Sequence, residues 1–218
     1  MSRGMFITFE GPEGSGKSTQ IRLLDEQLRA RGRPTLLTRE PGGTPTGEAI
    51  RRLLQHEASD AEMAHRTEVL LFCASRSQIV EQVIRPALGQ GTWVLCDRFT
   101  DSTLAYQGYG RGFALDELRA LNRFATGGLV PDLTLLLDIP VDESFRRIAA
   151  RASAIDRIER AEQVFHERLR AGYLELAAAE PLRFRVLSSA RPAGQTAALV
   201  WQAVLDRFEP NELKHHAD

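Results

Sequence analysis

Apolar residues follow two patterns along the chain, short continuous runs and longer stretches in which they recur every three or four positions. Short runs are typical of buried strands, and the spaced pattern indicates helices with one apolar face. Strands are expected at residues 5–9, 34–38, 93–96, 133–137 and 184–187. Helices are expected at about 46–55, 141–151, 158–179 and 192–208, within 100–126, and after the first strand, where Ile21, Leu24 and Leu28 share a face. This alternation predicts a parallel sheet covered by helices on both faces.

The longest predicted helix carries its own start signal. Ser59 is followed three residues later by Glu62, which is the spacing of a capping box. The helical pattern then continues to Arg85, and Pro86 marks the approach of its end. We therefore expect one long helix that begins just after Ser59.

The composition fits a single domain with a buried core. In 218 residues, hydrophobic side chains make up 43% and charged ones 26%. The formal net charge of -1 gives no field that attracts a nucleic acid or an anionic membrane, so neither partner is expected. No apolar run is long enough to span a membrane and no secretory signal is present, which favours the cytoplasm. We expect one domain over residues 1–210, a polar disordered tail over 211–218, and two buried thiols at Cys73 and Cys96.

A glycine-rich segment follows the first predicted strand and precedes the first predicted helix. Residues 11–18, Gly-Pro-Glu-Gly-Ser-Gly-Lys-Ser, match the phosphate-binding pattern G-x-x-x-x-G-K-[ST] at every position. Its glycines let backbone N–H groups converge on phosphate oxygens, Lys17 reaches the β- and γ-phosphates, and the Ser18 hydroxyl ligates Mg²⁺. The residues expected to bind ATP are Gly11, Pro12, Glu13, Gly14, Ser15, Gly16, Lys17, Ser18 and Thr19.

The phosphate loop leaves three classes of protein open: a GTPase switch, an ATP-driven motor and a kinase for a small acceptor. The sequence contains neither the guanine-reading N-K-x-D nor an LSGGQ-like transporter signature. A kinase needs a second set of cations for a second anion. The predicted elements bring four arginines toward one cleft: Arg39, Arg51, Arg76 and Arg98. Phe72 shares a helical face with Arg76, where a ring can stack on a base beside a guanidinium that hydrogen-bonds it.

Further segments resemble the bacterial thymidylate kinase family in order and spacing. They are Phe6–Ser18, Thr38-Arg-Glu-Pro-Gly-Gly-Thr44, Leu71–Arg76, Asp97-Arg-Phe, Ser102-Thr-Leu-Ala-Tyr-Gln-Gly108, Pro131–Asp138 and Asp156–Glu159. The resemblance implies a three-layer α/β P-loop fold with a central five-stranded parallel sheet and a small mobile lid at about residues 147–159. It also implies a homodimer that transfers the γ-phosphoryl group of MgATP to dTMP, giving dTDP on the route to dTTP. A kinase for another small acceptor is the first alternative, and a nucleotide-driven switch that signals through partners is the second.

The resemblance implies a pocket for the thymine base. Phe72 would stack on the base, Arg76 would hydrogen-bond its O4 edge, and Thr103 and Gln107 would complete the contacts. Tyr106 would close off the ribose 2′ position and so favour deoxynucleotides. A buried methyl group is worth only about 1 kcal/mol, so rejection of dUMP should be modest. The amine of cytosine would face the Arg76 donors and leave them unpaired, so its exclusion should be stronger.

The resemblance also assigns the sugar and phosphate contacts. Glu13 would meet the sugar 3′-hydroxyl, and Arg39, Arg51 and Arg98 would hold the acceptor phosphate. Lys17 and Arg98 are expected to act in catalysis by stabilising charge on the phosphates. No general base is expected, because the attacking oxygen belongs to a phosphate that is largely deprotonated near neutral pH.

Two carboxylates follow predicted strands and compete for the Mg²⁺ role. Asp97 is expected to orient the metal together with Ser18, by analogy with the acidic residue that ends a neighbouring strand in other phosphate-loop enzymes. Asp138 is the competitor, and for this residue a helix cap or an ion pair is expected instead.

The predicted lid is rich in arginine. The phosphate loop has Gly14 where some relatives carry a catalytic arginine, so the resemblance implies that the lid supplies the catalytic cation. We assign that role to Arg151, with Arg157 as the alternative. Three further arginines near the break between the two helices are expected to be solvated: Arg146, Arg147 and Arg160.

Overall fold

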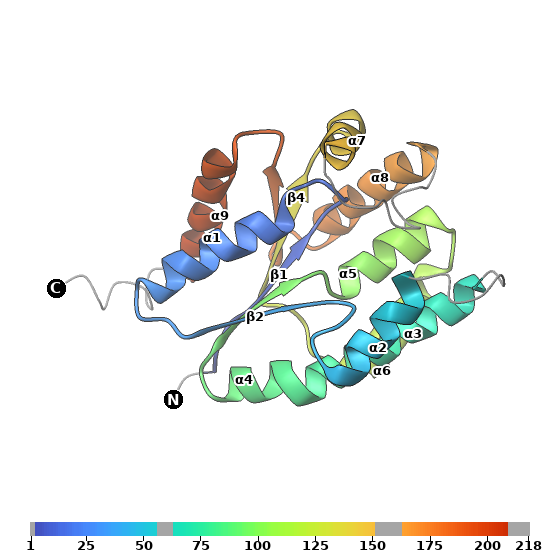
Figure 1. Ribbon diagram of the computed structural model, residues 1–218, viewed down its shortest axis with the longest axis horizontal. Helices are drawn as coiled ribbons and strands as arrows, with labels where there is room; N and C mark the ends of the chain where they lie inside the picture. The colour runs from blue at the N-terminus through green and yellow to red at the C-terminus, as the bar shows by residue number, and fades with distance from the viewer. Residues whose placement is uncertain (1–2, 56–62, 151–162, 209–218) are drawn as a thin grey trace.

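The computed structural model describes residues 3–55, 63–150 and 163–208. These residues form a five-stranded sheet in the order β2-β3-β1-β4-β5, and all neighbouring strands are parallel (Figure 1). The strands are β1 Phe6–Glu10, β2 Thr35–Arg39, β3 Trp93–Asp97, β4 Leu133–Asp138 and β5 Phe184–Ser188. The strand prediction and the parallel arrangement are confirmed. The predicted tail and most of the predicted lid lie outside the described residues.

Helices cover both faces of this sheet. They are α1 Lys17–Arg29, α2 Pro45–Gln55, α3 His65–Ile79, α4 Arg85–Gly89, α5 Thr100–Thr103, α6 Leu115–Thr126, α7 Val141–Ala149, α8 Gln163–Ala179 and α9 Ala193–Phe208, with π-helical turns η1 Val80–Ile84 and η2 Leu104–Gly110. In Figure 1, α1 and α9 lie to the left of the sheet, and α3, α6 and α8 lie to its right. The predicted three-layer architecture is confirmed. The predicted start of α8, at Ile158, lies outside the described residues.

The central strand β1 is buried on both faces. Ile7 and Phe9 pack with Leu24 of α1 and Val204 of α9 in one apolar core. Phe6 points to the other side, into a second core formed with residues of α3, η1 and α4. Burial on two sides explains why this strand reads as a continuous apolar run.

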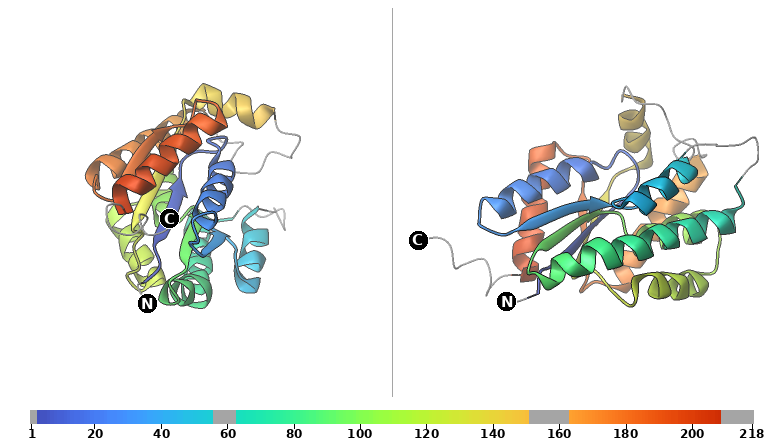
Figure 2. Two further views of the ribbon diagram at one scale, coloured as in Figure 1. Left: turned by 90° about the vertical axis from the view of Figure 1, so that its left-hand side faces the viewer. Right: turned by 60° about the horizontal axis from the view of Figure 1, so that its bottom comes forward.

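The long helix before β3 starts later than the capping box predicts. Ala64 has an extended backbone, with ψ of 136°, and α3 begins at His65. The predicted capping pair lies outside the described residues, but a helix continuous from that pair is wrong. The first turn of α3 contains Glu68, which is buried and accepts a hydrogen bond from Gln107. A helix that begins at His65 places Glu68 in this position. From there α3, η1 and α4 run on as one continuous rod, which ends at Gly89 shortly after the proline (Figure 2).

The parallel register brings the ends of three strands level at one edge of the sheet. Phe9 of β1 and Arg39 of β2 both pair with Asp97 of β3. The next peptide groups continue the alignment, because the Arg98 N–H donates to the Phe9 carbonyl at 3.0 Å and the Glu40 N–H donates to the Asp97 carbonyl at 2.9 Å. Loops that leave parallel strands at a common edge, beside a change in the direction of strand order, form the usual ligand crevice of such sheets.

Two smaller predictions concern membranes and thiols. Among the described helices, none combines the length and the apolar character that crossing a bilayer requires. Cys73 and Cys96 are both free and buried, which confirms their predicted character.

Candidate nucleotide-binding site

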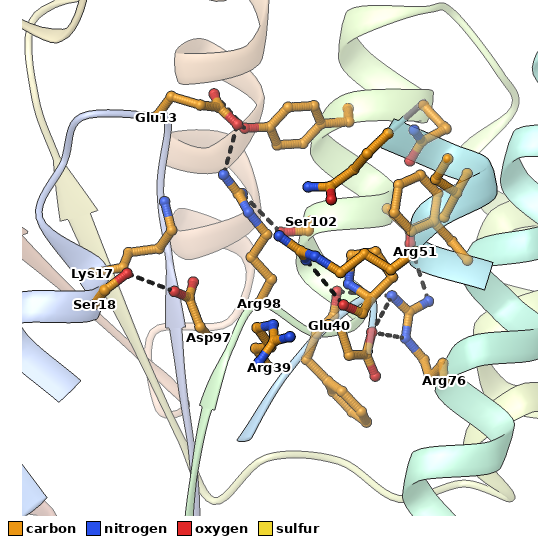
Figure 3. A pocket seen from close by; sticks show the side chains of 18 of the residues that line it. Glu13, Lys17, Ser18, Arg39, Glu40, Arg51, Arg76, Asp97, Arg98 and Ser102 are labelled. Carbon is orange, nitrogen blue, oxygen red and sulfur yellow. Dashed lines mark hydrogen bonds and ion pairs between the residues drawn. The ribbon is translucent and has the colours of Figure 1, made fainter. Parts of the chain in front are cut away.

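A cleft of about 370 Å³ opens beyond the carboxyl ends of β1, β2 and β3 (Figure 3). Most of the predicted site residues line it: Glu13, Gly14, Gly16, Lys17, Ser18, Thr19, Arg39, Arg51, Phe72, Arg76, Asp97, Arg98, Thr103, Tyr106 and Gln107. Lys17 and Ser18 lie at one end of the view and Arg76 at the other, with Arg98 between them (Figure 3). The cleft therefore extends from the phosphate loop to Arg76, so that two ligands can bind in it end to end.

The phosphate loop has the backbone that its glycines predict. Gly11, Gly14 and Gly16 have φ values of 133°, 72° and 90°, in the region that side chains disfavour. A Cβ on Gly11 would also lie 2.5 Å from the carbonyl oxygen of Leu137. Gly16 is the N-cap of α1, and no side chain of the described residues caps this helix. The Thr19 N–H donates to the Gly16 carbonyl at 3.1 Å, which leaves the N–H groups of Lys17 and Ser18 at the start of α1 for an anion.

Lys17 is folded back on the phosphate loop. Its Nζ donates to the carbonyls of Gly11 and Pro12, both at 2.9 Å, and lies 3.4 Å from Ser15 Oγ. These three residues do not line the cleft but hold the ammonium group beside it. Burial lowers the pKa of Lys17 to about 8, and the charge of Arg98 acts in the same direction.

Asp97 and Ser18 form an oxygen pair next to the loop. Ser18 Oγ donates to Asp97 Oδ2 at 3.2 Å, and Asp97 Oδ1 is buried without a hydrogen-bond partner among the described residues. Carboxylate and hydroxyl oxygens suit Mg²⁺, so the residues present fit this ion. Asp138 is instead held by Arg170, whose Nε and Nη2 donate to its two oxygens at 2.7 Å and 2.9 Å. The predicted ion pair at Asp138 is confirmed.

A charged cluster occupies the middle of the cleft. Arg98 Nη2 donates to Glu13 Oε1 at 2.8 Å, and the Tyr106 hydroxyl lies 2.6 Å and 2.7 Å from the two oxygens of that carboxylate. Although burial raises the pKa of Glu13, the positive charges of Arg98 and Lys17 lower it below its ordinary value. Glu13 is thus held as a carboxylate on the wall of the cleft.

Two more predicted cations approach from the side of β2 and α2. Arg39 Nη2 donates to Glu48 Oε1 at 2.8 Å, and Arg51 Nη1 donates to the Pro41 carbonyl at 3.0 Å. Both arginines line the cleft together with Arg98. The structure therefore brings together the three guanidinium groups predicted for one anion.

Arg76 is a buried hub at the far end of the cleft. Its Nε donates to Glu40 Oε2 at 2.8 Å, and its Nη1 donates to Thr103 Oγ1 at 3.0 Å and to Asn122 Oδ1 at 2.6 Å. Its Nη2 donates to the Phe99 carbonyl at 3.1 Å and lies 2.7 Å from Glu40 Oε2. All five N–H groups thus have protein acceptors. A ligand atom that binds Arg76 has to replace one of them.

Sequence reasoning missed the acceptors of Arg76. Glu40 directly follows Arg39 in the segment that carries the family resemblance, so its position was a usable signal. Asn122 lies 46 residues beyond Arg76, on α6, and no local pattern marks it.

The amide of Gln107 has a defined orientation. Its Nε2 donates to Glu68 Oε1 at 2.9 Å, and Glu68 is fully buried and paired with Arg111 at 3.2 Å. An ionised carboxylate only accepts hydrogen bonds, so the NH₂ side of the amide faces Glu68. Gln107 lines the cleft and Glu68 does not. The side-chain carbonyl oxygen of Gln107 therefore faces the cleft, on the opposite side of the amide from Glu68.

The helix after β4 braces the phosphate loop. Ser144 Oγ donates to the Glu13 carbonyl at 2.6 Å, and Arg147 donates from Nη1 to the Gly14 carbonyl at 3.3 Å and from Nη2 to the Ser189 carbonyl at 3.0 Å. The prediction that Arg147 is merely solvated is therefore wrong. The fold brings loop carbonyls within reach of its guanidinium, which the local charge pattern does not encode.

The remaining arginines near the predicted lid do not contact the phosphate loop in the described residues. Arg146 is exposed and pairs with Glu143 on the same helix, as a solvated charge does. Arg151, Arg157 and Arg160 lie outside the described residues.

Comparison with known proteins identifies the family. A sequence model of the thymidylate kinase family matches residues 9–200. The chain belongs to this family. The thymidylate kinase of Deinococcus radiodurans is 50% identical over 207 residues, which cover 95% of this chain and 99% of the relative. The thymidylate kinase of Geotalea daltonii is 47% identical over 214 residues, covering 95% and 100%, and that of Ectopseudomonas mendocina is 51% identical over 211 residues, covering 97% of each.

In this thymidylate kinase family member, we predict that Glu40→Ala costs several times more stability than Glu81→Ala. Removing Glu40, whose side chain is 3% exposed, leaves the buried Arg76 charge without its carboxylate, which costs about 3–5 kcal/mol. Glu81 pairs with Arg85 at the surface, and losing such a pair costs at most about 1 kcal/mol. Urea denaturation gives the free energy of unfolding of both variants. Equal losses would show that the buried pair carries no special weight.

Proposed function

We propose that this protein phosphorylates dTMP to dTDP, with MgATP as donor, in the supply of dTTP. The observation that carries the proposal is one cleft with the phosphate loop at one end, Arg76 at the other and Arg98 between them, which Phe72 also lines. Membership of the thymidylate kinase family and the names of its close relatives support the same substrates.

The donor binds at the phosphate loop. Backbone N–H groups and the N-terminus of α1 receive the phosphates, and Lys17 exchanges the loop carbonyls for β- and γ-phosphate oxygens. Ser18 and Asp97 would hold Mg²⁺. When bound, this ion neutralises charge on the phosphate oxygens.

The acceptor binds across the middle of the cleft. Arg39, Arg51 and Arg98 hold its phosphate, and the Glu13 carboxylate accepts a hydrogen bond from the sugar 3′-hydroxyl. Tyr106, held on Glu13, fills the space beside the sugar and so disfavours a 2′-hydroxyl. The attacking phosphate oxygen needs no general base, and catalysis consists of positioning and charge stabilisation.

The base pocket presents a donor and an acceptor in the order that thymine requires. Arg76 exchanges Thr103 for the O4 atom of the base, and the carbonyl oxygen of Gln107 accepts the N3–H, while Phe72 stacks on the ring. Cytosine has an amine and a lone pair at these two positions. It would leave buried polar groups unpaired, which disfavours its binding.

The remaining catalytic cation comes from the lid. We keep Arg151 in this role, with Arg157 as the alternative. The crowding at Gly14 supports a cation from elsewhere, because a Cβ there would lie 2.9 Å from the carbonyl oxygen of Ser144. An arginine in that part of the phosphate loop would displace α7. Closure of a lid would also exclude water from the phosphoryl group.

Two further properties belong to the proposal. The enzyme acts in the cytoplasm, which the two free, buried cysteines suit. It acts as a homodimer, which is supported by large exposed apolar side chains on the adjacent helices α2, α3 and α6: Leu53, Leu70 and Phe124.

If the protein is a homodimer, its mass in sedimentation velocity should be twice the chain mass of 24.3 kDa. Covering three exposed apolar side chains favours the association. Leu70→Asp replaces one of these apolar side chains with a charge and should shift the population toward monomer, whereas Glu26→Asp on α1 should not. Sedimentation velocity at several protein concentrations measures both. A wild-type protein that stays monomeric would contradict the dimer.

The substrate panel tests the function directly. With MgATP, we expect ADP formation fastest with dTMP, roughly fivefold lower kcat/KM with dUMP for the missing methyl group, and at least about 10³-fold lower values with dCMP and dGMP. Lys17→Ala, which removes the ammonium group from the phosphate loop, should be inactive with every acceptor. Equal rates across the panel would refute the base pocket, and a preference for another acceptor would reassign the substrate.

The orientation of Gln107 predicts a specificity change in Glu68→Gln. The new amide can donate to Gln107, which allows Gln107 to turn its NH₂ group toward the base. We expect the ratio of kcat/KM for dTMP to that for dCMP to fall about tenfold, the effect of one hydrogen bond of about 1.4 kcal/mol. Glu117→Gln on α6, at an exposed position outside the cleft, is the matched control. An unchanged ratio in Glu68→Gln would contradict the orienting role.

A further inference from the structure

Glu10 is a buried carboxylate for which the proposed reaction has no use. It is the last residue of β1 and directly precedes the phosphate loop. Its side chain is fully buried and does not line the cleft. A buried charge has to be satisfied by hydrogen bonds, so the partners of Glu10 indicate what it holds in place.

Its first oxygen holds the backbone next to Arg98. Glu10 Oε1 accepts a hydrogen bond from the Phe99 N–H at 2.7 Å, and the carbonyl of Phe9 accepts one from the Arg98 N–H at 3.0 Å. Arg98 has a φ of 69°, in the left-handed region. Such a conformation persists at a residue with a side chain only where the surroundings impose it. Two consecutive residues of β1 thus fix the peptide groups on both sides of Arg98.

Its second oxygen acts on the guanidinium of Arg98. Glu10 Oε2 accepts hydrogen bonds from Ser102 Oγ at 2.6 Å and from the Tyr173 hydroxyl at 2.9 Å. Arg98 Nη1 donates to the same two hydroxyl oxygens, at 3.2 Å and 3.3 Å. The two hydroxyl oxygens also lie 2.9 Å from each other. Each has one hydrogen, and where an ionised Glu10 accepts both hydrogens, the lone pairs of both oxygens are left for Arg98.

We propose that Glu10 is a positioning residue for Arg98, which it orients for the acceptor phosphate through the Phe99 N–H and through the hydroxyls of Ser102 and Tyr173. This role rests on the proposed function, because it takes Arg98 as a ligand of that phosphate. Glu10 itself touches neither substrate. Its effect should therefore be felt by the acceptor and hardly by ATP.

The role depends on the ionised form of Glu10. A protonated Glu10 would donate to one of the two hydroxyls and could no longer accept from both, so their lone pairs would no longer be held toward Arg98. Burial raises the pKa of Glu10 to about 7, and the charge of Asp101 adds to this, against the hydrogen bond from Ser102 and the charge of Arg98. The titratable and charged groups that act on Glu10 come from six segments around it: Lys17 on α1, Arg76 on α3, Cys96 on β3, Arg98 in the loop after β3, Asp101 on α5 and Tyr173 on α8. Acceptor binding should weaken as the pH falls through about 7.

Glu10→Gln tests the proposal. The amide has nearly the shape of the carboxylate but carries no charge and donates from one side. We expect KM for dTMP to rise about tenfold and KM for ATP to change less than about twofold. In the wild type, kcat/KM for dTMP should decrease as the pH is lowered through about 7. In Glu10→Gln this decrease should be absent, and kcat/KM should decrease only where the substrate phosphate is protonated, at about pH 6.

Tyr173→Phe tests the same connection without touching the carboxylate. It removes one hydroxyl from a buried ring and should raise KM for dTMP alone. In the double variant with Glu10→Gln the two effects should be less than additive, because both act through that hydroxyl. Thr8→Val is the matched control: it removes a buried β1 hydroxyl that contacts Thr134 at 2.9 Å, and KM for dTMP should stay unchanged.

The outcomes are separable. If the wild type phosphorylates dTMP but Glu10→Gln keeps its KM and its pH profile, the positioning role is wrong. Equal increases in KM for both substrates would also overturn it, since they indicate a general structural effect. If Glu10→Gln does not fold, Tyr173→Phe decides alone by the same two KM values. A wild type that does not phosphorylate dTMP would instead refute the proposed function.

Discussion

The cations of the described cleft are held by acceptors of the protein itself. Lys17 donates to loop carbonyls, Arg98 donates to Glu13, and Arg76 donates to Glu40. Burial makes this pairing necessary, because an ionised group without a partner away from water costs roughly several kcal/mol. The cleft is therefore a set of positive charges at defined positions. An anionic ligand enters by replacing some of their acceptors with its own oxygens, which preserves the pairing.

The parallel sheet brings these charges within reach of one another. Arg39 and Phe9 are level with Asp97, and the chain turns out of all three strands at the same edge. Arg98 therefore reaches the carbonyl of Gly11, 87 residues earlier in the chain, at 3.2 Å. In an all-helical fold, no strand register would align the loops of such distant segments. In a parallel sheet, the register of the strands aligns them.

The helical side of the cleft is shaped by a widened turn. The short helix α5 continues into the π-helical turn η2, and Thr103, Tyr106 and Gln107 from this stretch all line the cleft. Wide turns of this kind are frequent at functional sites, where they direct side chains that a regular helix would place elsewhere.

Local patterns were sufficient for the strands, most helices and the phosphate loop, because each of these depends on neighbours in the sequence or on a short motif. The resemblance to the family named Thr103, Tyr106 and Gln107, which line the cleft. Local patterns failed for the start of α3 and for Arg147, and they left the acceptors of Arg76 unnamed. The amino-acid sequence by itself thus determined which chemical groups the cleft contains. Only the tertiary structure decided which acceptor holds each cation. The physical reason is that a hydrogen bond depends on a distance of a few ångströms between segments such as α3 and α6, and the packing of those segments sets that distance.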